Sequence, residues 1–137
     1  MCYFLYASLY GDIPASDYQS VQKRYPYKIS PGTKHDLKLT VAAAEDCVQS
    51  DFRCTDWVCD CDSPVGQHDP DDPMIRSLGA LISELAALPG AKQIHLCKTW
   101  AGRRNKREIR LKLSDTDLPE FLADLQENCL YSLDLQA

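Results

Sequence analysis

Short apolar runs and alternating apolar and polar residues mark the strands of this chain. The run from Cys2 to Tyr10 is aromatic and aliphatic and ends at Gly11, which indicates a buried strand. The hydrophobic pattern predicts four further strands, over 36–43, 93–100, 107–113 and 130–135. Because only a short loop separates 93–100 from 107–113, these two strands are expected to pair as a hairpin.

One long apolar stripe and two weaker signals predict helices. Asp72-Pro73 combines a capping carboxylate with a proline at the first helical position, and Pro89-Gly90 ends the pattern. Between them lies a stripe at helical spacing, made of Met74, Ile75, Leu78, Leu81, Ile82, Leu85 and Leu88. A shorter helix is expected between Asp12 and Pro26, and another after Asp117, which can cap it.

The order of these elements is βαβ, a loop, then αββαβ, which predicts an α+β fold. We expect a two-layer sandwich with helices on one face of a largely antiparallel sheet. A ferredoxin-like relative is the preferred architecture, because βαβ and ββαβ pieces both occur. Residues 1–137 are expected to form a single domain, with an irregular loop rich in cysteine and aspartate at about 45–72.

Composition indicates where the protein is located more clearly than which reaction, if any, it catalyses. The chain has 137 residues, of which 45% are hydrophobic and 26% charged, with a net charge of −5. No apolar run approaches the roughly 18 residues that cross a bilayer, and the apolar start lacks the basic region of a signal peptide. The expected location is therefore the cytoplasm. Seven cysteines cannot all pair internally, and in a reducing compartment clustered cysteines more often bind metal or perform redox chemistry.

The loop contains the residues of a candidate metal site. Cys54, Cys59, Cys61 and His68 offer three sulfurs and one nitrogen, a set that suits tetrahedral zinc. Seven aspartates between 51 and 72 make the loop anionic, which disfavours an unassisted thiolate and favours a bound cation. The spacing C-x4-C-x-C-x6-H matches no standard zinc knuckle, so the pattern is only moderately specific.

Two other interpretations of the cysteines remain open. In the first interpretation, Cys54 and Cys59 are packed as small apolar residues, because free cysteine is often buried. Cys2, at the start of an apolar strand, is then likewise a buried structural thiol. In the other, the cluster is redox-active. A Cys59–Cys61 bridge closes a strained eleven-membered ring, so Cys54 is then the expected partner.

A basic segment follows the predicted long helix. Lys98 to Lys112 holds seven basic residues against Glu108 alone, which gives it a charge of +6 and leaves −11 on the rest of the chain. An anionic partner would meet the tip and outer face of the predicted hairpin, at Trp100, Arg103, Arg104, Lys106, Arg107 and Arg110. That partner is a protein, a second copy through its acidic loop, or nucleic acid; a membrane is not expected. Plain solvation is the remaining alternative.

These observations favour a small cytosolic, non-catalytic zinc-binding domain that engages an anionic partner through its basic hairpin. The alternative is a thiol-dependent redox enzyme that uses the cysteines at 54, 59 and 61. The phosphate-binding, dinucleotide-binding, serine-hydrolase and zinc-protease motifs are all absent from the sequence, which disfavours those classes of enzyme. Whether the chain is an enzyme stays undecided, because an active site can be assembled from residues that are distant in sequence.

Overall fold

The centre of the structure is a mixed five-stranded sheet. The computed structural model describes residues 2–32, 53–100 and 107–136. The strands β1 (Tyr3–Gly11), β2 (Ser30–Pro31), β3 (Ala91–Trp100), β4 (Arg107–Lys112) and β5 (Cys129–Asp134) lie in the order β2-β1-β3-β5-β4. The pairs β1–β3 and β3–β5 are antiparallel, whereas β1–β2 and β4–β5 are parallel. The α+β class is confirmed, the sheet is mixed rather than largely antiparallel, and the strand expected over 36–43 lies outside the described residues.

The expected hairpin is wrong, although both of its strands form. β5 lies between β3 and β4, pairing with β3 over Gln93–Leu96 and with β4 along its whole length. Burial explains this order. The first five residues of β5 are all buried, as befits an interior strand, whereas the residues of β4 are exposed or half-buried. A strand with many exposed charges is suited to the edge of a sheet.

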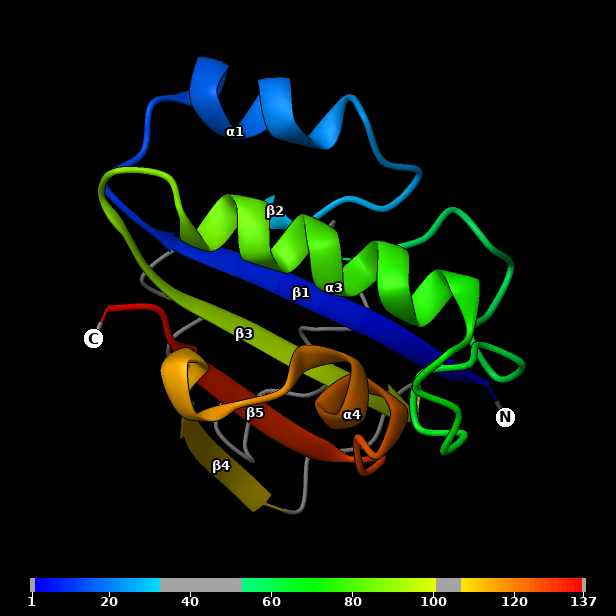
Figure 1. The fold of residues 1–137 in the computed structure, drawn as a ribbon. Helices are drawn as coiled ribbons and strands as arrows, with labels where there is room; N and C mark the ends of the chain where they lie inside the picture. Colours follow the sequence, from blue (N-terminus) through cyan, green and yellow to red (C-terminus); the bar gives the residue numbers. More distant parts are fainter. Residues whose placement is uncertain (1, 33–52, 101–106, 137) are drawn as a thin grey trace.

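Three helices occur in the described residues, and Figure 1 shows α3 and α4 crossing the same face of the sheet. Helix α3 (Pro73–Ala86) starts where the sequence predicts, since the Asp72 carboxylate accepts a hydrogen bond from the Met74 N–H at 2.8 Å. Helix α1 (Ala15–Gln22) packs against α3. The short helix α4 (Leu118–Ala123) follows a single 3-10 turn and is capped by Asp117, which accepts from the Glu120 N–H.

The main core lies between the sheet and α3. Alternate residues of β1 and β3, such as Leu5, Leu9 and Leu96, are fully or almost fully buried against the apolar stripe of α3. A smaller apolar cluster, made of Tyr6, Cys97 and Leu130 with Phe4 beside it, lies on the opposite face. The first residues of β1 are held in the sheet by their pairing with β3, and the cysteine-rich loop contacts β1 at these residues.

Candidate metal centre

The described part of the cysteine-rich loop substitutes for a strand along one edge of β1. In an antiparallel sheet the N–H and C=O of one residue point to the same side. On the side of β1 away from β3, the Leu5 carbonyl accepts from the Cys54 N–H at 2.9 Å, and the Tyr3 carbonyl accepts from the Asp60 N–H at 2.8 Å. Side chains serve the two remaining donors. The Tyr3 N–H donates to the Cys61 Sγ at 3.2 Å, and the Leu5 N–H donates to the Asp60 Oδ2 at 2.7 Å.

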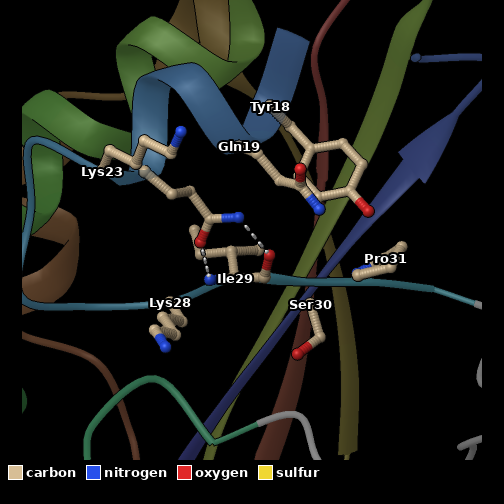
Figure 2. A pocket seen from close by; sticks show the side chains of 8 residues that line it. Tyr18, Gln19, Lys23, Lys28, Ile29, Ser30 and Pro31 are labelled. Atoms are coloured by element: carbon tan, nitrogen blue, oxygen red, sulfur yellow. Dashed lines mark hydrogen bonds between the residues drawn. The ribbon is translucent and has the colours of Figure 1, made fainter. Parts of the chain in front are cut away.

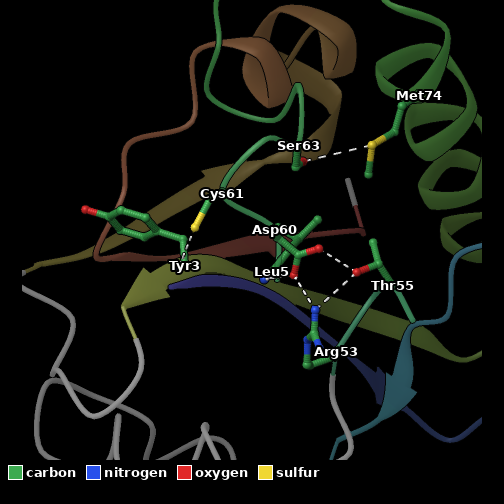
Figure 3. Close-up of polar contacts among 8 residues, drawn as sticks. All are labelled: Tyr3, Leu5, Arg53, Thr55, Asp60, Cys61, Ser63 and Met74. Carbon is green, nitrogen blue, oxygen red and sulfur yellow. Dashed lines mark hydrogen bonds and ion pairs between the residues drawn. The ribbon is translucent and has the colours of Figure 1, made fainter. Parts of the chain in front are cut away.

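Asp60 is the anchor of this loop, as Figure 3 shows. Its side chain is fully buried, and its carboxylate accepts from the Leu5 N–H, from the Thr55 hydroxyl and from the Arg53 Nη2 at 3.0 Å. The Arg53 guanidinium also stacks over the Phe4 ring, 4.6 Å from its centroid. Since Asp60 stands between Cys59 and Cys61 in the sequence, this network fixes the backbone that carries both cysteines.

Three cysteine sulfurs meet beside this anchor. The Sγ atoms of Cys2, Cys59 and Cys61 all lie within 4.8 Å of one another, and all three residues are half-buried. A tetrahedral zinc with Zn–S bonds of about 2.3 Å holds its sulfurs about 3.8 Å apart, so each separation needs to shrink by at most about 1 Å. The Tyr3 N–H that donates to Cys61 is the type of outer contact that supports a metal-bound thiolate. This arrangement is a candidate metal-binding cysteine group.

Two of the four predicted ligands belong to this group, and two lie elsewhere. Cys59 and Cys61 are in it. The Cys54 side chain is 1% exposed within the hydrophobic core, where burial and the nearby Asp60 carboxylate raise the pKa of its thiol. His68 is exposed, has a positive φ of 65°, and its Nδ1 lies 2.9 Å from an Asp124 carboxylate oxygen. The structure thus assigns Cys54 to packing, one of the alternatives left open by the sequence.

The sequence does not predict Cys2 as a ligand, because the spacing of cysteines along the chain identifies only residues that are close in sequence. It lies 57 positions before Cys59, and the apolar strand that follows it indicates a packed thiol. Its partners arrive only because the loop binds the edge of β1. No signal in a single sequence records that contact.

A buried lysine supports the loop from the sheet side. Lys98 of β3 has no exposed surface, and its Nζ donates to the carbonyls of Val65 at 2.9 Å and Ser63 at 3.4 Å. Burial lowers the pKa of Lys98, while the negative charges of Glu127, Asp60 and Asp62 oppose that shift. The ammonium group therefore lies close to the negative charges of the loop. The alternation of side chains along β3 places Lys98 on the same face as the buried Leu96, which is the face of the core.

The basic segment is only partly described. Arg103, Arg104 and Lys106 lie outside the described residues. Trp100 is half-buried and meets the Tyr3 ring edge to face at 5.1 Å between centroids. Arg107 and Arg110 are exposed on the edge strand β4, and the Arg110 Nη2 lies 3.6 Å from an Asp134 carboxylate oxygen.

A separate groove of about 390 Å³ opens between α1 and β2 (Figure 2). The Gln22 side chain forms part of its wall and bonds both backbone groups of Ile29, donating to its carbonyl and accepting from its N–H. Two lysines, Lys23 and Lys28, are on its rim, but none of its lining residues is a cysteine, histidine or carboxylate. The groove therefore offers no metal ligands.

No protein-family model, no curated protein and no solved structure matches this chain. The ferredoxin-like relation thus has no structural neighbour to support it. In the described part of the chain no helix has both the length and the apolar character to cross a membrane.

Proposed function

We propose that this chain is a small metal-binding domain that holds one zinc ion through Cys2, Cys59 and Cys61. The observation that carries the proposal is that three sulfurs lie within 4.8 Å of one another at the N-terminal end of β1. Soft thiolates select zinc or another thiophilic ion over magnesium or calcium. Zinc is the ion of choice because the three thiolates are accompanied by carboxylates, whose charge a divalent cation balances more fully than a monovalent one.

The proposed role of the metal is to attach the loop to the first strand. Cys2 precedes β1, whereas Cys59 and Cys61 belong to the loop, so a bound ion links two segments that the unfolded chain does not hold together. Its binding free energy then contributes to folding. The proposed role is non-catalytic, because the three donors that bind the Asp60 carboxylate, namely the Leu5 N–H, the Thr55 hydroxyl and the Arg53 Nη2, hold the loop in place.

Metal analysis tests the proposal directly. Protein purified without chelators or a nickel-affinity step should contain about one zinc per chain. Zinc at 100 times its Kd should stabilise the folded state by about 2.7 kcal/mol, which corresponds to a rise of roughly 10 °C in Tm. Cys2→Ser and Cys59→Ser should each abolish this rise, whereas Cys54→Ala should preserve it. A metal-free protein whose Tm does not respond to zinc contradicts the proposal.

The proposal also includes an anionic partner for the basic segment, where Arg107 and Arg110 are exposed. If its arginines neutralise phosphates, the log of the binding constant for single-stranded DNA should fall with the log of salt concentration by about 0.7 per contact. A flat salt dependence contradicts phosphate binding.

A further inference from the structure

The cysteine group has a second chemical capacity that does not need a metal. Three thiols that lie within 4.8 Å of one another can also be oxidised in pairs, because two sulfurs need to approach by at most about 2.7 Å to form a bond of about 2.05 Å, a movement that rotation of the side chains can supply. All three are half-buried rather than buried, so a small oxidant can reach them. The question is which pair forms.

The loop backbone disfavours the pair that is nearest in sequence. A Cys59–Cys61 bridge needs a tight ring centred on Asp60. The Asp60 N–H is bound to the Tyr3 carbonyl at 2.8 Å, and its carboxylate is bound by three donors, so the backbone at this residue is held on the edge of β1. Closing the ring would require these contacts to break.

Cys2 is the member of the group that comes from outside the loop. It lies immediately before β1, which begins at Tyr3, so a bridge to Cys2 does not close a ring across Asp60. The Cys61 Sγ accepts from the N–H of Tyr3, the residue next to Cys2, which places this sulfur beside the Cys2 backbone. Cys54 is removed from the competition because its thiol lies in the core and burial raises its pKa.

We propose that Cys2 is the obligatory half of a disulfide, formed with Cys61 or Cys59, when a hydroperoxide oxidises this site. One thiolate attacks the peroxide; the S–O bond forms, the O–O bond breaks, and the departing alkoxide or hydroxide takes up a proton. A second thiolate attacks the sulfenic sulfur; the S–S bond forms, the S–O bond breaks, and the hydroxide leaves as water after taking up a proton. Two thiols are oxidised and one hydroperoxide is reduced to an alcohol, or to water when it is hydrogen peroxide.

Oxidation and metal binding exclude each other at this site. A disulfide consumes two of the three sulfurs and leaves one, so zinc held there is released. This consequence rests on the proposed function, whereas the disulfide itself does not.

The experiment treats zinc-loaded and zinc-free protein with equimolar hydrogen peroxide and follows two readouts. Free zinc is measured with a chromogenic chelator, and the bridge is located by mass spectrometry of peptides prepared without reductant. We expect a bridge from Cys2 to Cys61 or Cys59 in both samples, release of about one equivalent of zinc, and reversal of both by dithiothreitol. Cys2→Ser should lower the yield of bridged cluster at least tenfold, and Cys54→Ala should leave it unchanged.

The outcomes separate this proposal from the previous one. A Cys59–Cys61 bridge, a bridge that uses Cys54, or oxidation to sulfinic acids without a bridge overturns the assignment of Cys2. If zinc binds but no Cys2 bridge forms, the oxidation site is wrong and the metal site stands. If the bridge forms in a protein that never binds zinc, the metal site is wrong and the oxidation site stands.

Discussion

Removing the Asp60 carboxylate should strongly destabilise this protein, because Asp60 holds the described part of the cysteine-rich loop on β1. Asp60→Ala leaves the fully buried Leu5 N–H without its acceptor and separates the Arg53 guanidinium, whose side chain is 26% exposed, from its counter-ion. It also removes the acceptor of the Thr55 hydroxyl. Loss of a buried backbone acceptor costs about 1–3 kcal/mol, and breaking a buried ion pair by removing one partner costs about 3–5 kcal/mol.

Because Arg53 keeps some contact with water and the Thr55 hydroxyl can rotate, these costs do not add in full. We expect Asp60→Ala to lower the free energy of unfolding by about 3–5 kcal/mol, a large part of the roughly 5–15 kcal/mol typical of a domain. Asp60→Asn keeps an oxygen for the Leu5 N–H but loses the charge that faces Arg53. Its loss should be smaller, at about 1–3 kcal/mol.

Urea denaturation of the zinc-free variants measures these losses without contribution from the metal. Asp56→Ala is the matched control, because Asp56 is an exposed aspartate in the same loop and its loss should change stability by less than about 0.5 kcal/mol. The reasoning is refuted if Asp60→Ala is within 1 kcal/mol of Asp56→Ala at an unchanged m-value. Such a result would mean that the buried network contributes no net stability.

Two further changes test other parts of the described structure. Lys98→Met should destabilise the fold by about 2 kcal/mol, because two loop carbonyls lose their donor, whereas Lys92→Met at an exposed site of β3 should be neutral in the same urea titration. The hydrogen bonds from Tyr25 and Arg24 lower the pKa of Glu84 from 4.5, so the stability that this carboxylate supplies is present above about pH 4.5 and is lost as the pH falls further. The Tm difference between wild type and Glu84→Gln should therefore shrink between pH 6 and pH 3, and a difference that is constant with pH contradicts this.

The elements that the sequence predicts well are those whose signal is local. Helix α3 combines its cap at Asp72, its proline at position 73 and an apolar stripe, and all three features appear in the structure. The apolar character of β1 and β5 likewise follows from short runs of residues, because burial of a strand depends mainly on its own side chains. Local patterns of this kind decide the type of an element.

Pairing and site assembly depend on contacts that no local pattern records. The short connection between 93–100 and 107–113 favours a hairpin, but the more apolar β5 takes the interior place and moves β4 to the edge. The sequence places Lys98 in the basic segment, whereas the structure buries it, where its ammonium group donates to the carbonyls of Ser63 and Val65. The same limit applies to Cys2. Half of the predicted ligand set, Cys59 and Cys61, could be found from adjacency alone.

The position of the cysteine group also explains why metal binding and loop stability should depend on each other. The exposed backbone groups of an edge strand attract other strands, and proteins cover such edges. Here the loop covers the start of β1 with two backbone N–H groups, those of Cys54 and Asp60, and with two side-chain acceptors, the Asp60 carboxylate and the Cys61 sulfur. A thiolate held by a metal remains a fixed acceptor for the Tyr3 N–H, whereas a bridge from Cys2 to Cys61 or Cys59 repositions the sulfur. The chemical state of these three sulfurs therefore determines how completely the start of β1 is covered.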